Sequence, residues 1–406
     1  MNNTQDPKRH VEYLQQCLSS DKKPLGFFLG AGCPMAIKSD PDKQTPLIPG
    51  LEGITAIVRE ALAESSEFGS LLNAIDANFE LDGRDNATVE DILTHIRALR
   101  TIAGKDQVRG LSAANLDRID DEICRIIHQT VNIDLPNAET AYNSIATWVN
   151  AIEREFPVEV FTTNYDLLME QAFEEAHVPY FDGFTGVRRP FFDLRAMEED
   201  QLPPRWARLW KLHGSVNWHY IPNKGVFRST VNDADESKRV IYPSHLKYQE
   251  SRRLPYLAMI DRLRAFLKNP TSVLVICGYS FRDEHLNEAI IQALQSTRTS
   301  TAFALLFGKL ENYTEAVSLA KDQSNLALLA RNGGIIGKLA TSWPTKDADS
   351  VIDNGNSWIS WNSCDGSSDV SKVAAEFKLG DFDVFGQFLL EVAGCVRQPA
   401  EVHDVQ

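Results

Sequence analysis

Four short polar or glycine-rich segments each follow an apolar stretch that is typical of a buried strand. They are Gly30-Ala31-Gly32, the TTNYD segment at 162–166, His213-Gly214 and Gly278-Tyr279-Ser280. Ligands of open parallel sheets bind beyond the carboxyl ends of the strands, so the four segments could line one crevice. A buried strand that runs into a glycine turn is the expected start of a nucleotide-binding sheet. Taken singly, a glycine pair is also typical of a tight turn, and a histidine after a strand is often structural.

The apolar pattern predicts an α/β architecture that places these segments on one sheet. We expect strands at 25–29, 158–161, 208–212, 272–277, 303–307 and 335–339. We expect helices at 11–18, 167–176, 254–267 and 283–294, and a hairpin excursion within 216–242. Such an alternation of strands and helices favours a Rossmann-like parallel sheet.

Two further regions differ in sequence pattern from the segments of the predicted sheet. Residues 54–63, 88–100 and 116–129 have apolar side chains at three- and four-residue spacing, with a capping sequence at 86–90, and predict a helical insertion. The polar stretch 347–369 predicts a linker or surface loop, and 377–392 an aromatic-rich helix. We therefore predict three parts: a sheet domain at 1–50 and 155–345, a helical insertion at 51–154, and a C-terminal extension at 346–406.

Composition excludes several classes of protein. With 43% apolar and 24% charged residues, the chain is globular and is neither disulfide-rich, collagen-like nor a coiled coil. Its net charge of −15 disfavours direct binding to nucleic acid, which depends on neutralising phosphates. One basic stretch, 247–268, could form a local basic groove or a solvated helix face.

Cysteine spacing and the apolar runs bear on metal sites and on location. The six cysteines show no CxxC knuckle, which predicts no zinc site, and scattered free thiols fit a reducing compartment. The first residues lack a signal-peptide pattern and the apolar runs are too short to cross a bilayer. We expect a soluble, cytoplasmic protein that has no membrane partner.

Taken in order, the GAG, TTNYD, KLHGS and GYS segments resemble the motifs of the sirtuin catalytic domain. The resemblance covers roughly 25–50 and 156–310 and implies a sirtuin-type sheet that binds NAD. Three features depart from protein deacylases of that family. The four-cysteine zinc module is missing, Cys33-Pro34 follows the glycine loop where the family carries a serine, and the Pro-Asp-Phe-Arg segment is absent before Gly50. These departures argue against peptide deacylation.

The chain is more similar to the sirtuin-like branch of bacterial anti-phage proteins, particularly in GYSFRDEH at 278–285. That resemblance implies a zinc-free NAD hydrolase with a helical insertion, and NAD as the substrate rather than a resident cofactor. It also implies a homo-oligomer restrained by a HerA-type ATPase partner. A non-catalytic NAD or ADP-ribose sensor, or an NAD-dependent deacylase or ADP-ribosyltransferase, are the alternatives.

The resemblance also implies roles for individual residues. Asn164 would orient the ribose and a water, because an amide offers a donor and acceptors without a charge. His213 would accept a proton. Asp166 would bind ribose or stabilise positive charge, or alternatively cap the helix that follows it. The residues implied to contact NAD are Gly30, Ala31, Gly32, Thr163, Gly278 and Ser280, with the backbone amides of the first glycine loop approaching the pyrophosphate.

A few neighbouring residues carry simpler expectations. Tyr165 and Trp218 are expected to pack in the core, and His219 and His245 have no metal-ligand spacing. Asp283 and Glu284 are interpreted as first-turn acids of a helix, with a place at the pocket rim as the alternative. The aromatic side chains of 377–392 (Phe377, Phe382, Phe385 and Phe388) could form an interface or pack on the same chain.

Overall fold

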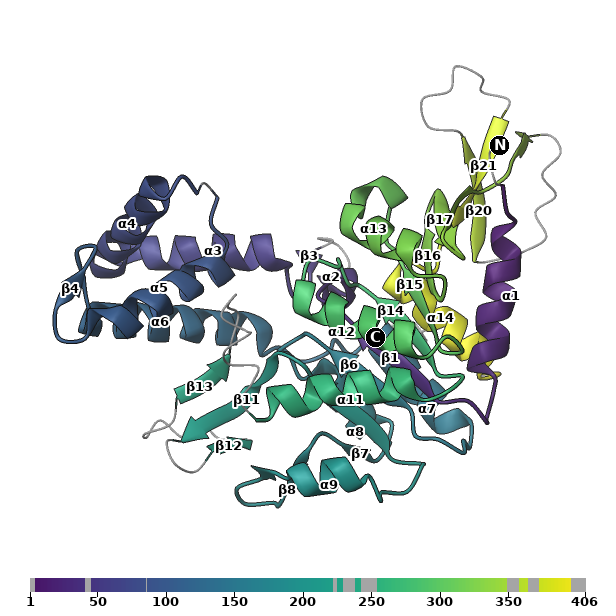
Figure 1. The fold of residues 1–406 in the computed structure, drawn as a ribbon, viewed down its shortest axis with the longest axis horizontal. Helices are drawn as coiled ribbons and strands as arrows, with labels where there is room; N and C mark the ends of the chain where they lie inside the picture. The colour runs from purple at the N-terminus through teal and green to yellow at the C-terminus, as the bar shows by residue number, and fades with distance from the viewer. Residues whose placement is uncertain are drawn as a thin grey trace, which may run out of the picture.

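A computed structural model describes residues 4–40, 45–84, 86–221, 225–228, 238–241, 254–348, 358–363 and 372–395 (Figure 1). His245, Cys364 and the basic residues Lys247, Arg252 and Arg253 lie outside the described residues. The five described cysteines are free thiols. Within the described ranges, no helix combines the length and the apolar character needed to cross a bilayer.

A nine-stranded sheet forms the centre of the molecule, in the order β18-β17-β16-β15-β14-β1-β6-β10-β7. The strands from β16 to β7 pair in parallel, and β17 and β18 add an antiparallel edge. The predicted α/β class with a large parallel sheet is confirmed. The strand bounds are β1 Leu25–Leu29, β6 Glu159–Thr162, β7 Tyr180–Phe181, β10 Ala207–Lys211, β14 Val273–Cys277, β15 Thr301–Leu305, β16 Leu326–Ala330, β17 Gly333–Ile336 and β18 Leu339–Ser342.

Helices cover both faces of this sheet, so the central strands are buried on both sides. Every residue of β1, β6, β10 and β14 is buried, which explains their continuous apolar runs. Phe27 points into a core shared with one helix layer, whereas Phe28 points into the opposite core. The first layer contains α1 (Pro7–Leu18), α7 (Ala141–Ala151), α8 (Leu168–Glu175) and α14 (Phe382–Val392), and the second contains α11 (Tyr256–Lys268), α12 (Glu284–Ser296) and α13 (Thr314–Asp322).

Four helices form a lobe that extends to one side of the sheet in Figure 1. They lie between β1 and β6 in the chain: α3 (Leu51–Glu64), α4 (Ser66–Leu81), α5 (Val89–Ala103) and α6 (Ala113–Val131). The predicted cap at 86–90 is confirmed, since Thr88 is the N-cap of α5 and forms a capping box with Asp91. Helix α7, although inside the range predicted as an insertion, packs against α14 beside the sheet. The division into three parts stays a prediction.

A smaller antiparallel sheet contains the predicted hairpin excursion after β10 and two short strands, β8 and β9, that precede β10. Its order is β13-β11-β12-β9-β8. The strand bounds are β8 Phe184–Thr185, β9 Phe191–Phe192, β11 Gly214–Ile221, β12 Gly225–Arg228 and β13 Lys238–Ile241. Trp218 on β11 is 1% exposed and packs against Phe184 and Tyr256, which confirms its expected place in the core.

Three predictions for the last third of the chain were wrong in detail. The strand predicted at 335–339 is a hairpin of β17 and β18, because Gly337 and Lys338 both adopt positive φ, at 54° and 75°, and reverse the chain. Part of the predicted linker is strand β20 (Ile359–Ser363), which pairs with β21 (Lys372–Phe377). Because β21 extends to Phe377, the helix predicted at 377–392 begins only at Phe382. Strand β16 and helix α13 were not predicted.

The aromatic side chains of α14 face the body of the same chain. Phe385 lies 6.0 Å from Phe27 between ring centroids, and Phe382 lies 5.2 Å from Tyr142 of α7. Phe382, Phe385 and Phe388 are each at most 3% exposed. Packing within the chain, the second of the two interpretations of this segment, is therefore confirmed.

Replacing Phe27 tests this packing. Phe27 is fully buried and contacts Trp148 at 5.2 Å and Phe385 at 6.0 Å between ring centroids. We expect Phe27→Ala to lower the free energy of unfolding by about 3–5 kcal/mol, because it removes apolar contacts and leaves a cavity. Phe307, which is 68% exposed, supplies the control Phe307→Ala. Urea unfolding measures both; equal losses would contradict the packing described here.

Candidate functional site

The order of the central strands brings the four predicted segments to one edge of the sheet. Strands β14, β1, β6 and β10 are consecutive neighbours and run in parallel. Their carboxyl ends are followed by Gly278–Ser280, Gly30–Gly32, residues 162–166 and His213, in that order across the sheet. The carboxyl edge of the sheet is therefore the candidate site, as the sequence predicts.

The two glycine loops are in backbone contact with each other. The Gly32 amide donates to the Gly278 carbonyl at 2.8 Å, and the Gly30 amide donates to the Cys277 carbonyl at 2.9 Å. A Cβ on Gly30 would lie 2.4 Å from the Gly278 oxygen, and a Cβ on Gly278 would lie 2.5 Å from the Cys33 nitrogen. The glycines are thus required for the loops to meet. Because the Gly30 and Gly32 amides are already paired, the predicted amide contacts to a pyrophosphate remain a prediction for this loop.

Asn164 is held over the first glycine loop. Its Nδ2 donates to the Gly30 carbonyl at 3.2 Å, and its backbone amide donates to Thr162 Oγ1 at 3.0 Å. Thr162 Oγ1 in turn donates to the Leu29 carbonyl at 2.9 Å. These bonds fix the amide plane and leave Oδ1 as the acceptor side of the group. Asn164 is 8% exposed, so it is buried at the base of the site.

Tyr142 of α7 is a neighbour of Asn164 that the sequence analysis did not identify. Burial raises the pKa of Tyr142 well above its usual value, and the nearby Asp166 raises it further. The ring is 1% exposed and packs against Phe382. An aromatic residue on the apolar face of a helix gives no sequence signal for such a place.

His213 lies beside Asp283, at the start of α12. Their Nε2 and Oδ2 atoms are 3.0 Å apart, and each side chain is 12% exposed. Asp283 is also the N-cap of α12, since its Oδ1 accepts from the amides of His285 at 3.1 Å and Leu286 at 3.2 Å. The interpretation of Asp283 as an acid at the start of a helix is therefore confirmed, and a place at the pocket rim stays a prediction.

Asp166, two residues after Asn164, is buried in the protein. It is 5% exposed and its Oδ1 accepts from the Leu168 amide at 3.1 Å, at the start of α8. Lys211 donates to the Asp166 carbonyl and pairs with Glu170 at 3.1 Å. Burial raises the pKa of Asp166, and Lys211 opposes this shift. Asp166 thus accepts one amide of the first turn of α8, although the N-cap of that helix is Leu167, and its implied role toward ribose stays a prediction.

The remaining predicted contact residues lie nearer the surface. Ala31 and Ser280 are exposed, and Thr163 is half-buried with its amide donating to the Leu29 carbonyl at 3.3 Å. Tyr165 is partly buried, as expected, and packs against the core on its side of the sheet; its hydroxyl, near Glu90 and Arg97 of α5, has a raised pKa because of burial. Asn164 of the TTNYD segment therefore contacts the first glycine loop, and Tyr165 packs against the core on the side of the first helix layer.

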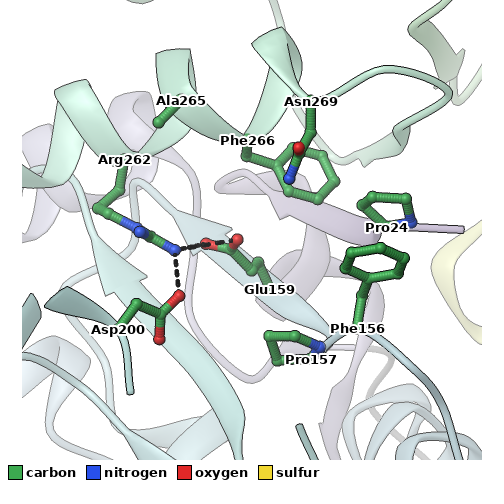
Figure 2. Close-up of a pocket in the computed structure, with 9 residues that line it drawn as sticks. All are labelled: Pro24, Phe156, Pro157, Glu159, Asp200, Arg262, Ala265, Phe266 and Asn269. Carbon is green, nitrogen blue, oxygen red and sulfur yellow. Dashed lines mark hydrogen bonds and ion pairs between the residues drawn. The ribbon is translucent and has the colours of Figure 1, made fainter. Parts of the chain in front are cut away.

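A cavity of about 160 Å³ lies at the opposite, amino-terminal edge of the sheet (Figure 2). Pro24 before β1, Pro157 before β6 and Phe266 of α11 line its apolar side, and Glu159 and Arg262 line its polar side. It is therefore separate from the four loops at the carboxyl edge.

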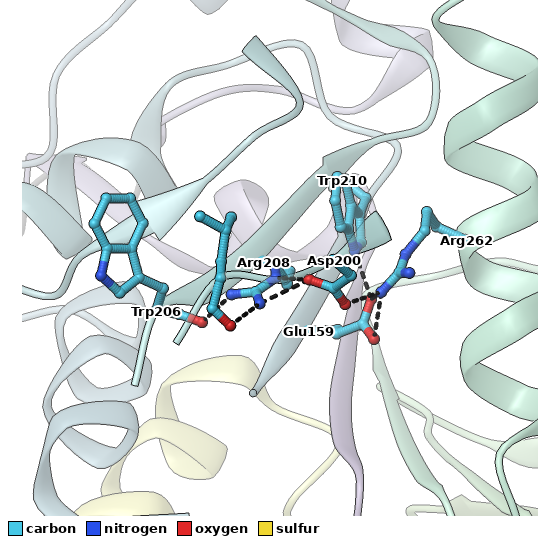
Figure 3. Close-up of polar contacts among 7 residues, drawn as sticks. Glu159, Asp200, Trp206, Arg208, Trp210 and Arg262 are labelled. Atoms are coloured by element: carbon cyan, nitrogen blue, oxygen red, sulfur yellow. Dashed lines mark hydrogen bonds and ion pairs between the residues drawn. The ribbon is translucent and has the colours of Figure 1, made fainter. Parts of the chain in front are cut away.

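Charged groups beside this cavity form a connected network of ion pairs and hydrogen bonds (Figure 3). Arg262 Nη2 lies 3.2 Å from both Glu159 oxygens and 2.9 Å from Asp200 Oδ2, and Arg208 Nε lies 2.8 Å from Asp200 Oδ1. Trp210 Nε1 donates to Glu159 Oε2 at 2.6 Å. Arg262, which falls in the basic stretch 247–268, thus turns inward, whereas Arg264 and Lys268 of the same helix lie toward solvent, as the interpretation of a solvated face expects. The network joins α11 to β6 and β10.

No group of three or more His, Cys, Asp or Glu side chains that could hold a metal ion occurs among the residues that the structure describes.

Residues 158–328 match the SIR2-like domain. This span runs from the start of β6 into β16 and contains Asn164, His213 and the Gly278 loop, whereas the Gly30 loop precedes it. The sheet is thus a Rossmann-like fold of the sirtuin type, and the resemblance predicted from the motifs is confirmed at the level of a SIR2-like domain.

Solved structures of Sir2 proteins are also similar to the chain. One, from work on the mechanism and regulation of Sir2 enzymes, shares 11% identity over 74% of this chain and 86% of that chain, with a TM-score of 0.36. A complex of a Sir2 homolog with NAD shares 13% identity over 75% of this chain and 86% of that chain, with a TM-score of 0.31. No curated protein matches the chain in sequence.

The charged network predicts a pH-dependent loss of stability in Arg262→Ala. Burial raises the pKa of Glu159, and Arg262 opposes this shift. Without Arg262, the folded-state pKa of Glu159 rises further above its unfolded value. Glu159 then binds its proton more tightly in the folded state than in the unfolded state. The free energy of unfolding therefore falls as pH rises through the folded-state pKa of Glu159. We expect a loss of about 3 kcal/mol relative to wild type at pH 8 and a smaller loss at pH 5.

Arg264→Ala on the same helix is the control, because Arg264 pairs with Asp261 at the surface. Urea unfolding at the two pH values measures both variants. An equal loss for Arg262→Ala at pH 5 and pH 8, or an equal loss for both variants, would contradict the role given to Glu159.

Proposed function

We propose that the protein is an NAD hydrolase that cleaves the nicotinamide–ribose bond and releases nicotinamide and ADP-ribose. The observation that carries the proposal is the placement of Asn164 and His213 beside the two joined glycine loops, at the carboxyl edge of four adjacent parallel strands. Similarity of residues 158–328 to the SIR2-like domain favours an NAD-using enzyme at the level of the family.

The chemistry makes modest demands on side chains. Glycosidic bonds of this kind break through an oxocarbenium-like transition state. The bonding electrons leave with the nicotinamide nitrogen, which loses its positive charge, so the leaving group needs little acid catalysis. Water then forms the new bond to the ribose carbon and gives up one proton. The enzyme must therefore position the ribose and the water and accept that proton.

Asn164 and His213 meet these demands in different ways. The Asn164 amide is fixed by its bond to the Gly30 carbonyl, so its Oδ1 can accept from a ribose hydroxyl or from the water. His213 is the base that takes up the proton. Both side chains come from neighbouring strand ends, β6 and β10, so they can act on the same sugar.

The loops supply the groups suited to the phosphates and the adenosine ribose. Ala31 and Ser280 are exposed on the two joined loops. Thr163, the residue before Asn164, adds a half-buried hydroxyl. Since the Gly30 and Gly32 amides bond within the protein, we assign phosphate contacts to the Ala31 amide and the Ser280 hydroxyl. Gly278 then acts by bringing these groups together.

The proposal extends to a biological setting. The GYSFRDEH segment and the helical lobe favour a role in anti-phage defence by NAD depletion, in the cytoplasm and as a homo-oligomer. Loss of NAD harms the host cell, so a restraint is needed, and a HerA-type ATPase is the partner proposed to supply it. These extensions rest on the resemblance described in the sequence analysis.

Turnover of NAD by the full chain tests the proposal. We expect equal amounts of nicotinamide and ADP-ribose, separated by chromatography. Asn164→Ala and His213→Ala should each lower the rate about 100-fold or more, because each removes a group that acts on the reacting centre. Asn150→Ala, at an exposed position of α7, is the control for an amide loss and should keep the wild-type rate.

The assay is run with and without the ATPase. Binding of NAD without release of nicotinamide under both conditions would contradict hydrolysis and support the sensor alternative. Cleavage of NAD only in the presence of an acylated peptide would support a deacylase instead.

A further inference from the structure

Asp283 uses its two carboxylate oxygens for two separate tasks. Oδ1 accepts the amides of His285 and Leu286 and so caps α12. Oδ2 lies 3.0 Å from His213 Nε2, and both side chains are largely shielded from water. Capping alone needs only one oxygen. The second contact therefore calls for an explanation other than helix formation.

The segment that carries Asp283 is tied to the protein at several points. The Tyr279 hydroxyl donates to the Asp283 carbonyl at 3.2 Å and lies 2.9 Å from Asn287 Oδ1. Asn287 Nδ2 donates to the Phe281 carbonyl at 2.7 Å, where Phe281 adopts a φ of 59°. Tyr279, Phe281 and Asn287 are buried. The position of the carboxylate is thus set by the same loop that contacts the first glycine turn.

The pairing has a direct consequence for the imidazole. An ionised carboxylate oxygen accepts hydrogen bonds but cannot donate them, so Nε2 must carry the proton and the lone pair of neutral His213 resides on Nδ1. A negative charge at this distance also favours the imidazolium that forms when the base takes up a proton. A carboxylate that orients a histidine in this way is a recurrent arrangement in catalysis by general bases.

We propose that Asp283 is a positioning residue for His213, which fixes its tautomer and stabilises its protonated form during NAD cleavage. This inference rests on the proposed function, because it assigns Asp283 a task only through the base. It also explains why an acid rather than another capping residue stands at the start of α12, since Ser and Asn cap a helix about as well as Asp.

Asp283→Asn separates the two tasks. Asparagine is as good an N-cap as aspartate, so α12 keeps its first turn, but the carboxylate facing Nε2 is lost. We expect kcat for NAD cleavage to fall about tenfold or more, with KM for NAD changing less than twofold. Glu284→Gln removes a charge from the next residue, an exposed one, and is the matched control that should keep the wild-type kcat.

A double-variant cycle distinguishes positioning from a general structural role. If Asp283 acts through His213, Asp283→Asn should have no further effect on the rate in a His213→Ala background. Equal losses in the wild-type and His213→Ala backgrounds, or a wild-type kcat in Asp283→Asn, would overturn the inference.

The tautomer of His213 gives a readout that does not need turnover. In the wild type, ¹⁵N shifts of the His213 ring should report a proton on Nε2, and Asp283→Asn should shift this population. A ring protonated on Nδ1 in both proteins would overturn the inference whether or not NAD is cleaved. Absence of NAD cleavage by the wild type, with or without the ATPase, would overturn the proposed function alone.

Discussion

The backbone contact between the loops after β1 and β14 is the constraint on which the candidate site depends. Gly32 donates to the Gly278 carbonyl, and a Cβ on Gly30 or Gly278 would collide with the opposite loop. Asn164 then bonds to the Gly30 carbonyl from the neighbouring strand end, and the continuation of the Gly278 loop delivers Asp283 to His213. One close approach of two glycine turns thus sets the positions of the groups contributed by β6, β10 and α12.

The two edges of the sheet use charge for different purposes. At the amino edge, Glu159, Arg262, Asp200 and Arg208 pair with one another and join α11 to the strands. At the carboxyl edge, the polar groups have unequal surroundings: Asp166 is buried against Lys211, whereas His213 and Asp283 retain some contact with solvent. Buried ion pairs that join three elements suit a structural role, and a pair that retains some exposure suits proton transfer to a bound molecule.

Much of this arrangement is predictable from the sequence because it is local. β1 is bounded by Pro24 and Gly30 and is apolar throughout, so its limits follow directly, and the Thr88 cap follows from the residue types. The hairpin at 333–342 was misjudged because Gly337-Lys338 lies inside an apolar run. Neither the position of Tyr142 beside Asn164 nor that of Asp283 beside His213 could be predicted, because those pairs form only when distant segments pack. The hydrogen bonds within the glycine loops could not be predicted either, because they have no signal in the sequence.

The position of bound ADP-ribose in a crystal of the full chain is the most direct test of the carboxyl edge as the site of NAD chemistry. The account predicts that the ribose next to the scissile bond lies within hydrogen-bond distance of Asn164 and that the phosphates lie against the Ala31 and Ser280 segments. ADP-ribose bound elsewhere, for example at the cavity lined by Glu159 and Arg262, would contradict it.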